Sequence, residues 1–311
     1  MSIAALTRRT FILGTAALMT GCLRSEPSGH IRLASGDPGG LYLAFSEILA
    51  QRIHVRYPSI DVDVISTAGS VENLALLRKG EVDMGLALAD VAERDRANGP
   101  VPTAPSAVAR VYENYLQVIV PDTSPAHHLS DLIGEKVSIG PDGSGASATS
   151  RLLFTAAELD GRVDLVGYRL RDGLAQLAER GISGLVWSGG VPTPAISELD
   201  AVLPLRIVDI SGQVRRMSEL SGYPYTLRPV PTCTYVPPGV RSIGVANLLL
   251  CRQGIATELV SAMVDTLANE APHLVPPYIR GLQYLDTPSM VQTGVIPLHS
   301  GAIDAYRELH G

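Results

Sequence analysis

Hydrophobic and polar residues follow two spacings along this chain, and their order predicts an α/β fold. Alternating or unbroken apolar runs indicate strands, and apolar residues that recur every three to four positions indicate helices. In the first part of the chain these patterns predict a strand at 31–33, a helix at 41–53, a strand at 62–64, a helix at 70–80 and a strand at 82–88. Repeats of strand and helix in this order form doubly wound lobes around a parallel sheet.

The helix at 70–80 has recognisable end signals. Ser70 is expected to be its N-cap, Glu72 suits the positive end of the helix, and Gly80 is expected to end it.

A Pro-rich segment at 98–105 interrupts the pattern, after which strands and helices alternate again. We expect a strand at 116–120 to carry the chain into a second α/β lobe, and the irregular, Pro-rich segment 226–239 to carry it back. The predicted division is lobe I at 30–115 plus 236–311 and lobe II at 116–235.

The N-terminal segment has the pattern of an export signal. Arg8 and Arg9 precede an apolar run at 11–19, which is shorter than the roughly 20 residues that span a bilayer. The paired arginines resemble a twin-arginine signal, although they also suit the general export route. Cys22 follows the run as in a bacterial lipobox; the alternative is an ordinary cleaved signal with a chance cysteine. We expect a signal peptide at 1–21 and a tether at 22–29.

These features predict an exported protein that is periplasmic or lipid-anchored through Cys22 to the outer face of the cell membrane. In such an oxidising compartment Cys233 and Cys251 could form a disulfide or remain two buried thiols. The net charge of −6 and the scattered basic residues argue against a nucleic-acid partner. No Cys/His cluster has metal-ligand spacing, and we expect no metal or cofactor.

Small residues mark the turns between predicted strands and helices. Gly39-Gly40, Gly69-Ser70 and Gly143-Ser144-Gly145 share this design, and Gly189-Gly190 adds a fourth small-residue turn. Unpaired N–H groups at helix starts can bind anionic groups without a cationic side chain. In open α/β sheets such turns lie where ligands bind. The alternative is that these residues only make tight turns and helix caps.

No enzyme signature is present. Ser144 is not part of a Gly-x-Ser-x-Gly motif, and neither a phosphate-binding loop nor a complete dinucleotide fingerprint occurs. His127-His128 is expected to be an exposed loop and not a metal pair. Trp187 is expected either in the core or stacked on a ligand. We therefore predict a binding protein and not an enzyme.

At these turns the sequence resembles the extracytoplasmic receptors of tripartite (TRAP) transporters, in the TAXI branch. Five motifs in the family's order carry the likeness over nearly the whole mature chain. The motifs are 66–73, similar to Ser-Thr-Gly-Gly-Ser-Val-Glu-Asn; 80–83, similar to Gly-Glu-Ala-Asp; 137–145, similar to a segment of the family that contains Gly-Ser-Gly; 189–196, similar to Gly-Gly-x-Pro-Thr-Pro-Ala-Ile; and 296–303, similar to Pro-Leu-His-Pro-Gly-Ala.

The resemblance implies a periplasmic-binding-protein fold of type II, with two doubly wound α/β lobes that close on a ligand about a hinge. It implies a monomer that delivers a small organic acid or amino-acid-like ligand to integral-membrane TRAP permease subunits, with glutamate, glutamine and 2-oxoglutarate as family precedents. Asn73 is expected to reach the ligand. The full set of expected ligand-binding residues is Gly39, Gly40, Tyr42, Thr67, Gly69, Ser70, Asn73, Ser144, Gly145, Gly189, Gly190, Pro192, Thr193 and Tyr235.

The chain departs from the family pattern at positions that are usually polar: it has Leu41, Leu88, Ala89 and Ala146. These replacements predict a ligand less polar than glutamate, or one held mostly by backbone N–H groups. Otherwise the chain serves as a lipoprotein sensor that presents its bound state to a membrane signalling partner. An enzyme on the same two-lobed fold is the third possibility.

Overall fold

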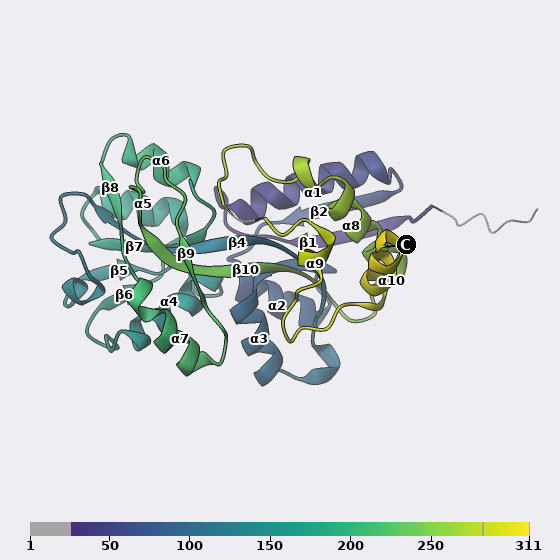
Figure 1. The fold of residues 1–311 in the computed structure, drawn as a ribbon, viewed down its shortest axis with the longest axis horizontal. Coiled ribbons are helices and arrows are strands. Elements are labelled where there is room, and N and C mark those ends of the chain that lie inside the picture. The colour runs from purple at the N-terminus through teal and green to yellow at the C-terminus, as the bar shows by residue number, and fades with distance from the viewer. Residues whose placement is uncertain (1–25, 282, 311) are drawn as a thin grey trace, which may run out of the picture.

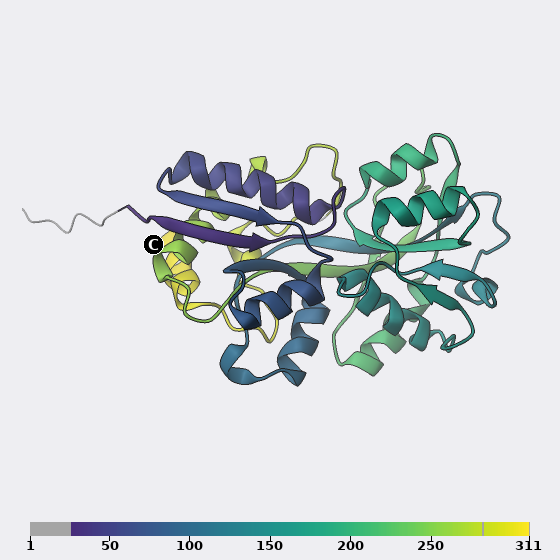
Figure 2. The same ribbon diagram turned by 180° about the vertical axis from the view of Figure 1, so that it is seen from behind.

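The computed structural model describes residues 26–281 and 283–310, so the predicted signal peptide and Cys22 lie outside the described residues. The described chain forms two lobes that lie side by side (Figures 1 and 2). Lobe I contains β1–β3, α1–α3 and α8–α10, and lobe II contains β5–β8 and α4–α7. Two long strands, β4 (Ser106–Pro121) and β10 (Arg241–Cys251), run through both.

Lobe I follows the predicted order of strands and helices. The central strand β1 pairs in parallel with β2 on one side and β3 on the other, and the unbroken apolar run at 84–88 forms the fully buried β3. The first elements of lobe I are β1 (Gly29–Ala34), α1 (Leu41–Arg56), β2 (Ile60–Ile65), α2 (Ser70–Lys79), β3 (Met84–Leu88) and α3 (Ala89–Asn98). Three further helices from the C-terminal part, α8 (Thr257–Asn269), α9 (Thr287–Met290) and α10 (Ser300–His310), belong to the same lobe.

Lobe II is built in the same manner on a smaller parallel sheet. Strand β5 pairs in parallel with both β6 and β7. The elements are β5 (Lys136–Ser138), α4 (Gly145–Ala156), β6 (Asp164–Val166), α5 (Leu170–Ala178), β7 (Gly184–Gly189), α6 (Pro194–Asp200), β8 (Leu205–Val208) and α7 (Val214–Ser221). Short 3-10 helices occur at Val101–Thr103, Leu129–Leu132, Ser211–Gln213 and Ala271–His273.

The connection between the lobes corrects the sequence prediction. Strand β4 begins at Ser106, well before residue 116, and the return is made by β10, which pairs antiparallel with β4 along its length. Segment 226–239 contains only the short strand β9 (Thr226–Pro229), which pairs with β10. Buried polar residues such as Glu113 and Asn114 interrupt the apolar pattern of β4, which explains why its first half was missed.

The strands join in one sheet with the order β2-β1-β3-β10-β4-β7-β5-β6. Three hydrophobic clusters cover it: one in lobe I around Phe45 and Met263, one in lobe II around Leu185 and Ile196, and a third that extends through both lobes from Leu74 to Phe154. The third cluster contains residues of β4 and β10 and gives the two lobes a common apolar layer. Among the described residues, no helix has both the length and the apolar character needed to cross a membrane.

The disulfide alternative for Cys233 and Cys251 is wrong in this structure, where both are free thiols. Cys233 packs at the edge of the lobe II cluster, whereas Cys251 ends β10 inside the lobe I cluster. Each thiol therefore belongs to a different core. Burial raises the pKa of Cys251 to about 12, so it stays protonated.

Candidate ligand-binding site

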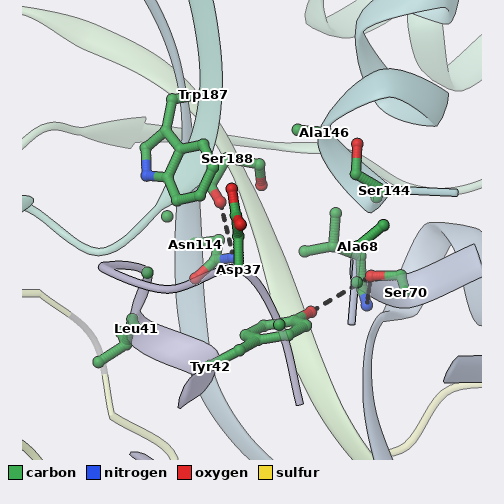
Figure 3. A pocket seen from close by; sticks show the side chains of 16 residues that line it. Asp37, Leu41, Tyr42, Ala68, Ser70, Asn114, Ser144, Ala146, Trp187 and Ser188 are labelled. Carbon is green, nitrogen blue, oxygen red and sulfur yellow. Dashed lines mark hydrogen bonds between the residues drawn. The ribbon is translucent and has the colours of Figure 1, made fainter. Parts of the chain in front are cut away.

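A small cavity lies between the two lobes and has a volume of about 50 Å³. A single water needs roughly 10–15 Å³ on the same measure, so the cavity holds a few waters or a compact ligand. Its walls combine turns of lobe I, turns of lobe II and strand residues of the shared sheet (Figure 3). The lining residues are Gly36, Asp37, Gly40, Leu41, Tyr42, Ala68, Gly69, Ser70, Leu88, Asn114, Ser144, Gly145, Ala146, Trp187, Ser188 and Gly189.

The topology explains why these residues meet. The turns that follow β1 and β2 and the last residue of β3 lie at the carboxyl ends of parallel strands, where ligands of open α/β sheets bind. Lobe II contributes the turn before α4 and the end of β7. Asn114 of β4 lies at the boundary between the lobes, where β4 pairs with both β10 and β7.

The start of α2 is bonded to the opposite lobe. The carbonyl of Gly143, in lobe II, accepts hydrogen bonds from the backbone N–H groups of Val71 and Glu72 at 3.0 Å each. These two N–H groups were expected to be available for a ligand. They instead hold the lobes together, and the Glu72 carboxylate accepts from Ala68 N at 2.6 Å.

Asp37 makes a second link across the cleft. Its carboxylate accepts from the guanidinium of Arg169 at 2.8 Å and from the backbone N–H of Leu170 at 2.9 Å. Arg169 precedes α5 and Leu170 begins it, so lobe I caps a lobe II helix while Gly143 of lobe II caps α2. Both links require the lobes to be close, and the structure is therefore a closed form.

The lobe I wall carries a hydrogen-bonded set around Tyr42. Its hydroxyl donates to Asn247 Oδ1 at 2.5 Å and lies 3.4 Å from Ser70 Oγ. Burial raises the pKa of Tyr42, so the phenol stays protonated and remains a donor. Ser70 was expected to be the N-cap of α2, but Gly69 occupies that position with φ +122°, and Ser70 Oγ accepts from Leu88 N at 3.0 Å.

On the opposite wall, α4 begins beside the cavity with unused donors. Ser144 is its N-cap, and its hydroxyl accepts from Ser147 N at 3.0 Å. The N–H groups of Gly145 and Ala146 have no acceptor among residues 26–281 and 283–310. Trp187 lies above the cavity, and a Cβ at Gly40 would approach its indole to 3.3 Å. The start of α4 is thus where the closed cleft offers free backbone donors.

Half of the expected binding residues line the cavity and half do not. Those that line it are Gly40, Tyr42, Gly69, Ser70, Ser144, Gly145 and Gly189. Those that do not are Gly39, Thr67, Asn73, Gly190, Pro192, Thr193 and Tyr235.

Asn73 was expected to reach a ligand, but the structure uses its whole amide inside lobe I. Its Nδ2 donates to the carbonyls of Ser35 and Leu86 at 2.6 and 2.8 Å, and its Oδ1 accepts from the hydroxyl of Thr67 at 2.6 Å. Asn73 and Thr67 therefore tie the β2–α2 turn to β1 and β3. The spacing that placed Asn73 near the cleft also suits this structural role.

The motif at 189–196 has a comparable supporting role. The buried hydroxyl of Tyr235 accepts from Thr193 N at 2.9 Å, and the Thr193 hydroxyl donates to the Gly190 carbonyl at 2.8 Å. Pro192 follows a cis peptide bond in this turn. These contacts fix the turn that follows Gly189, the part of the motif that lines the cavity.

Of the four departures from the family pattern, Leu41, Leu88 and Ala146 line the cavity, whereas Ala89, the first residue of α3, does not. Sequence reasoning missed Asp37, Asn114 and Ser188 as lining residues and left Trp187 undecided. The turn at Gly39-Gly40, just after Asp37, was identified from the sequence, but no local pattern marks a single polar residue within a buried strand. No cluster of metal-ligating side chains occurs among the described residues.

Comparison with known proteins gives the family of the chain and agrees with its fold. The model of the NMT1-like family matches residues 33–309. MatC from Rhodopseudomonas palustris, solved with bound malate, is 14% identical with a TM-score of 0.53, covering 76% of this chain and 82% of MatC. Tv2483 bound to L-arginine is 12% identical with a TM-score of 0.54, covering 79% of this chain and 87% of that protein.

A histidine kinase sensor domain with similarity to periplasmic binding proteins is 17% identical with a TM-score of 0.51, covering 80% of this chain and 94% of that domain. These likenesses show the fold alone: the chain has the two-lobed architecture of type II periplasmic-binding proteins, as predicted.

Proposed function

The chain belongs to the NMT1-like family, and on that premise we propose that it is an extracytoplasmic solute-binding receptor. It captures a small carboxylate or amino-acid-like ligand between its lobes and catalyses nothing. The observation that carries the proposal is the cavity at the lobe boundary, together with the cross-lobe bonds from Gly143 and Asp37. Hinged closure around a ligand is the usual working motion of such receptors.

A screen for ligand-induced stability tests this proposal. Small carboxylates, amino acids and dicarboxylates are added to the purified protein, and the melting temperature is followed. A ligand at 100 times its Kd adds about 2.7 kcal/mol to stability, which is readily seen. Malate and arginine are sensible first members because neighbouring structures hold them. If no acid or amino acid in a broad screen shifts the melting temperature, the proposal is wrong.

The finer assignment is a TAXI-type receptor that delivers its ligand to a TRAP permease and is anchored through Cys22. The motifs that resemble this branch support it. Cys22→Ala should move the protein from the membrane fraction to the soluble fraction, and the loaded receptor should drive ion-gradient-dependent uptake by its permease in proteoliposomes. Uptake that is equal without the receptor would contradict the transport assignment.

The alternative is a lipoprotein sensor for a membrane signalling partner. A histidine kinase sensor domain has the same fold, which is compatible with this alternative. The two roles separate by experiment. A transport receptor is needed for uptake, whereas a sensor is needed for ligand-dependent signalling while uptake continues without it.

A further inference from the structure

In the side-chain amide of Asn114 the nitrogen is hydrogen-bonded, whereas the oxygen bonds to no residue that the structure describes. Its Nδ2 donates to the Ser188 carbonyl at 3.3 Å, and its Oδ1 is buried without a partner among the described residues. The carbonyl of Ser188 can only accept, which fixes the orientation of the amide. Asn114 is 3% exposed, and its side chain projects into the space between Tyr42 and Trp187 (Figure 3).

The neighbouring donors cannot satisfy this oxygen. The Tyr42 hydroxyl gives its proton to Asn247, and the N–H of Leu88 points to Ser70. A buried acceptor without a donor is destabilising, so a ligand that supplies the donor should bind about tenfold more tightly than one that cannot. The cavity therefore favours a ligand with an N–H or O–H group at Asn114.

The lining of the cavity presents no cationic side chain to a ligand. Asp37 has the only acidic side chain among the sixteen lining residues, and no Lys, Arg or His is among them. Arg169 reaches Asp37 from outside the lining. The aromatic ring of Trp187 adds a surface that attracts cations. An ammonium group therefore fits the Asn114 side of the cavity better than a second carboxylate does.

The opposite side suits one anionic group. The unused N–H groups of Gly145 and Ala146 lie at the positive end of α4, next to the hydroxyl of Ser144. The corresponding groups of α2 are occupied by Gly143. The closed cleft thus has donors at α4 and an unfilled acceptor at Asn114.

Building on the proposed function, we infer that the ligand is a compact monocarboxylate bearing an amino group, and that Asn114 determines this specificity. The ammonium group donates to Asn114 Oδ1 beneath Trp187, and the carboxylate accepts from the first turn of α4. The apolar side chains of Leu41 and Leu88 and the methyl group of Ala146 face the remainder of the ligand.

Titration calorimetry on the unmodified protein tests the inference with matched compounds. The amino acids are glycine, L-alanine, L-serine and L-2-aminobutyrate; their deamino partners are acetate, propionate, 3-hydroxypropionate and butyrate; malonate, succinate and malate are the dicarboxylates. At least one amino acid should bind, and the affinity of its deamino partner should be lower by a factor of about ten or more. Tighter binding of a deamino acid or a dicarboxylate would overturn the inference while leaving the receptor proposal intact. Absence of binding by every compound in this set would overturn the inference, and only the broad screen above decides the receptor proposal.

Asn114→Leu, of similar size, should bring the affinity ratio of amino acid to deamino acid close to one. Gln117→Met is the matched control: Gln117 is a buried amide three residues later on β4, with an equally unpaired Oε1, but it does not line the cavity. If Asn114→Leu leaves this affinity ratio unchanged, or if Gln117→Met lowers it equally, Asn114 does not have the proposed role. If Asn114→Leu fails to fold, the matched compounds on the unmodified protein still decide.

Discussion

The carboxylate of Asp37 in lobe I accepts a hydrogen bond from the backbone N–H of Leu170 in lobe II, at 2.9 Å. Leu170 is the first residue of α5, so the positive end of that helix is capped from the other lobe. Gly143 does the same for α2 in the opposite direction. Opening the cleft breaks both caps at once, and these bonds therefore bias the protein toward closure.

Asp37→Ala should shift the equilibrium toward the open form. Loss of a helix cap costs about 1 kcal/mol, which corresponds to about a fivefold fall in the ratio of closed to open protein. The ion pair with the half-exposed Arg169 adds little, so Arg169→Gln should have a smaller effect. Trp187 is the only tryptophan and lines the cleft, so its fluorescence reports closure. Unchanged emission in Asp37→Ala would show that the cap does not bias closure.

Gly145→Ala should block full closure without unfolding either lobe. A Cβ at Gly145 would lie 2.5 Å from Ser70 Oγ and 2.7 Å from the Leu88 side chain, both in the opposite lobe. Within α4 itself alanine is a better helix former than glycine. We expect about a tenfold loss of ligand affinity or more, since overpacking costs about 1–3 kcal/mol, with an unchanged melting temperature of the ligand-free protein.

Gly212→Ala is the matched control for this substitution, because nothing lies within 4 Å of its added methyl group. Its affinity and melting temperature should equal those of the unmodified protein. Equal affinities for Gly145→Ala and the unmodified protein would mean that ligand binding does not need the observed closure.

Asn73→Ala should destabilise lobe I and not act on ligand contacts. It removes the bonds to Ser35 and Leu86 and the shorter of the two hydrogen bonds of the Thr67 hydroxyl, which also lies 3.2 Å from the Ser35 carbonyl. Each lost buried partner costs about 1–3 kcal/mol, so we expect the free energy of unfolding to fall by about 2–4 kcal/mol in urea titrations. Affinity measured on the folded fraction should be preserved. A large loss of ligand affinity at an unchanged free energy of unfolding would show that Asn73 contacts the ligand.

Asp90 should make stability depend on pH. Its Oδ2 accepts from the hydroxyls of Thr149 and Tyr225 at 2.8 and 2.6 Å, whereas its Oδ1 is buried without a partner among the described residues. Burial raises the pKa of this carboxyl in the folded protein. A raised folded pKa favours folding below the unfolded pKa of about 3.9, and this contribution is lost as pH rises through the folded value.

The comparison with Asp90→Asn isolates this contribution, because the amide has a similar shape and does not titrate. Urea titrations between about pH 4 and pH 8 should show the unmodified protein losing stability relative to Asp90→Asn as pH rises. Parallel profiles would show that Asp90 has no raised pKa in the folded protein.

Local patterns predicted the repeating parts of this fold. The apolar spacing of α1 and the unbroken apolar run of β3 are visible in the sequence, and Gly80 ends α2 in the left-handed conformation as expected, with φ +70°. The first half of β4 was hidden because its polar residues, such as Glu113, are buried by partners distant in sequence: Arg228 donates to that carboxylate at 2.6 Å. Such pairings leave no local signal.

The candidate site was predictable where it depends on turns and unpredictable where it depends on the meeting of lobes. Gly69-Ser70 and Ser144-Gly145 were identified as turn residues, and they line the cavity. Nothing in the sequence shows that Gly143 would cap α2 or that Asp37 would cap α5, since these contacts exist only after closure. Asn73 illustrates the converse, because a polar residue near a binding turn can serve the turn itself.

The chain enters and leaves the fold on the same lobe: β1 begins at Gly29, and α10, near the C-terminus, packs against α8 (Figure 1). Any support that holds the N-terminal end therefore holds lobe I, and lobe II, at the far end of β4 and β10, would be the lobe whose position changes when the cleft opens. A partner protein bound to lobe II would then detect from the position of this lobe whether a ligand is bound, without contacting the ligand.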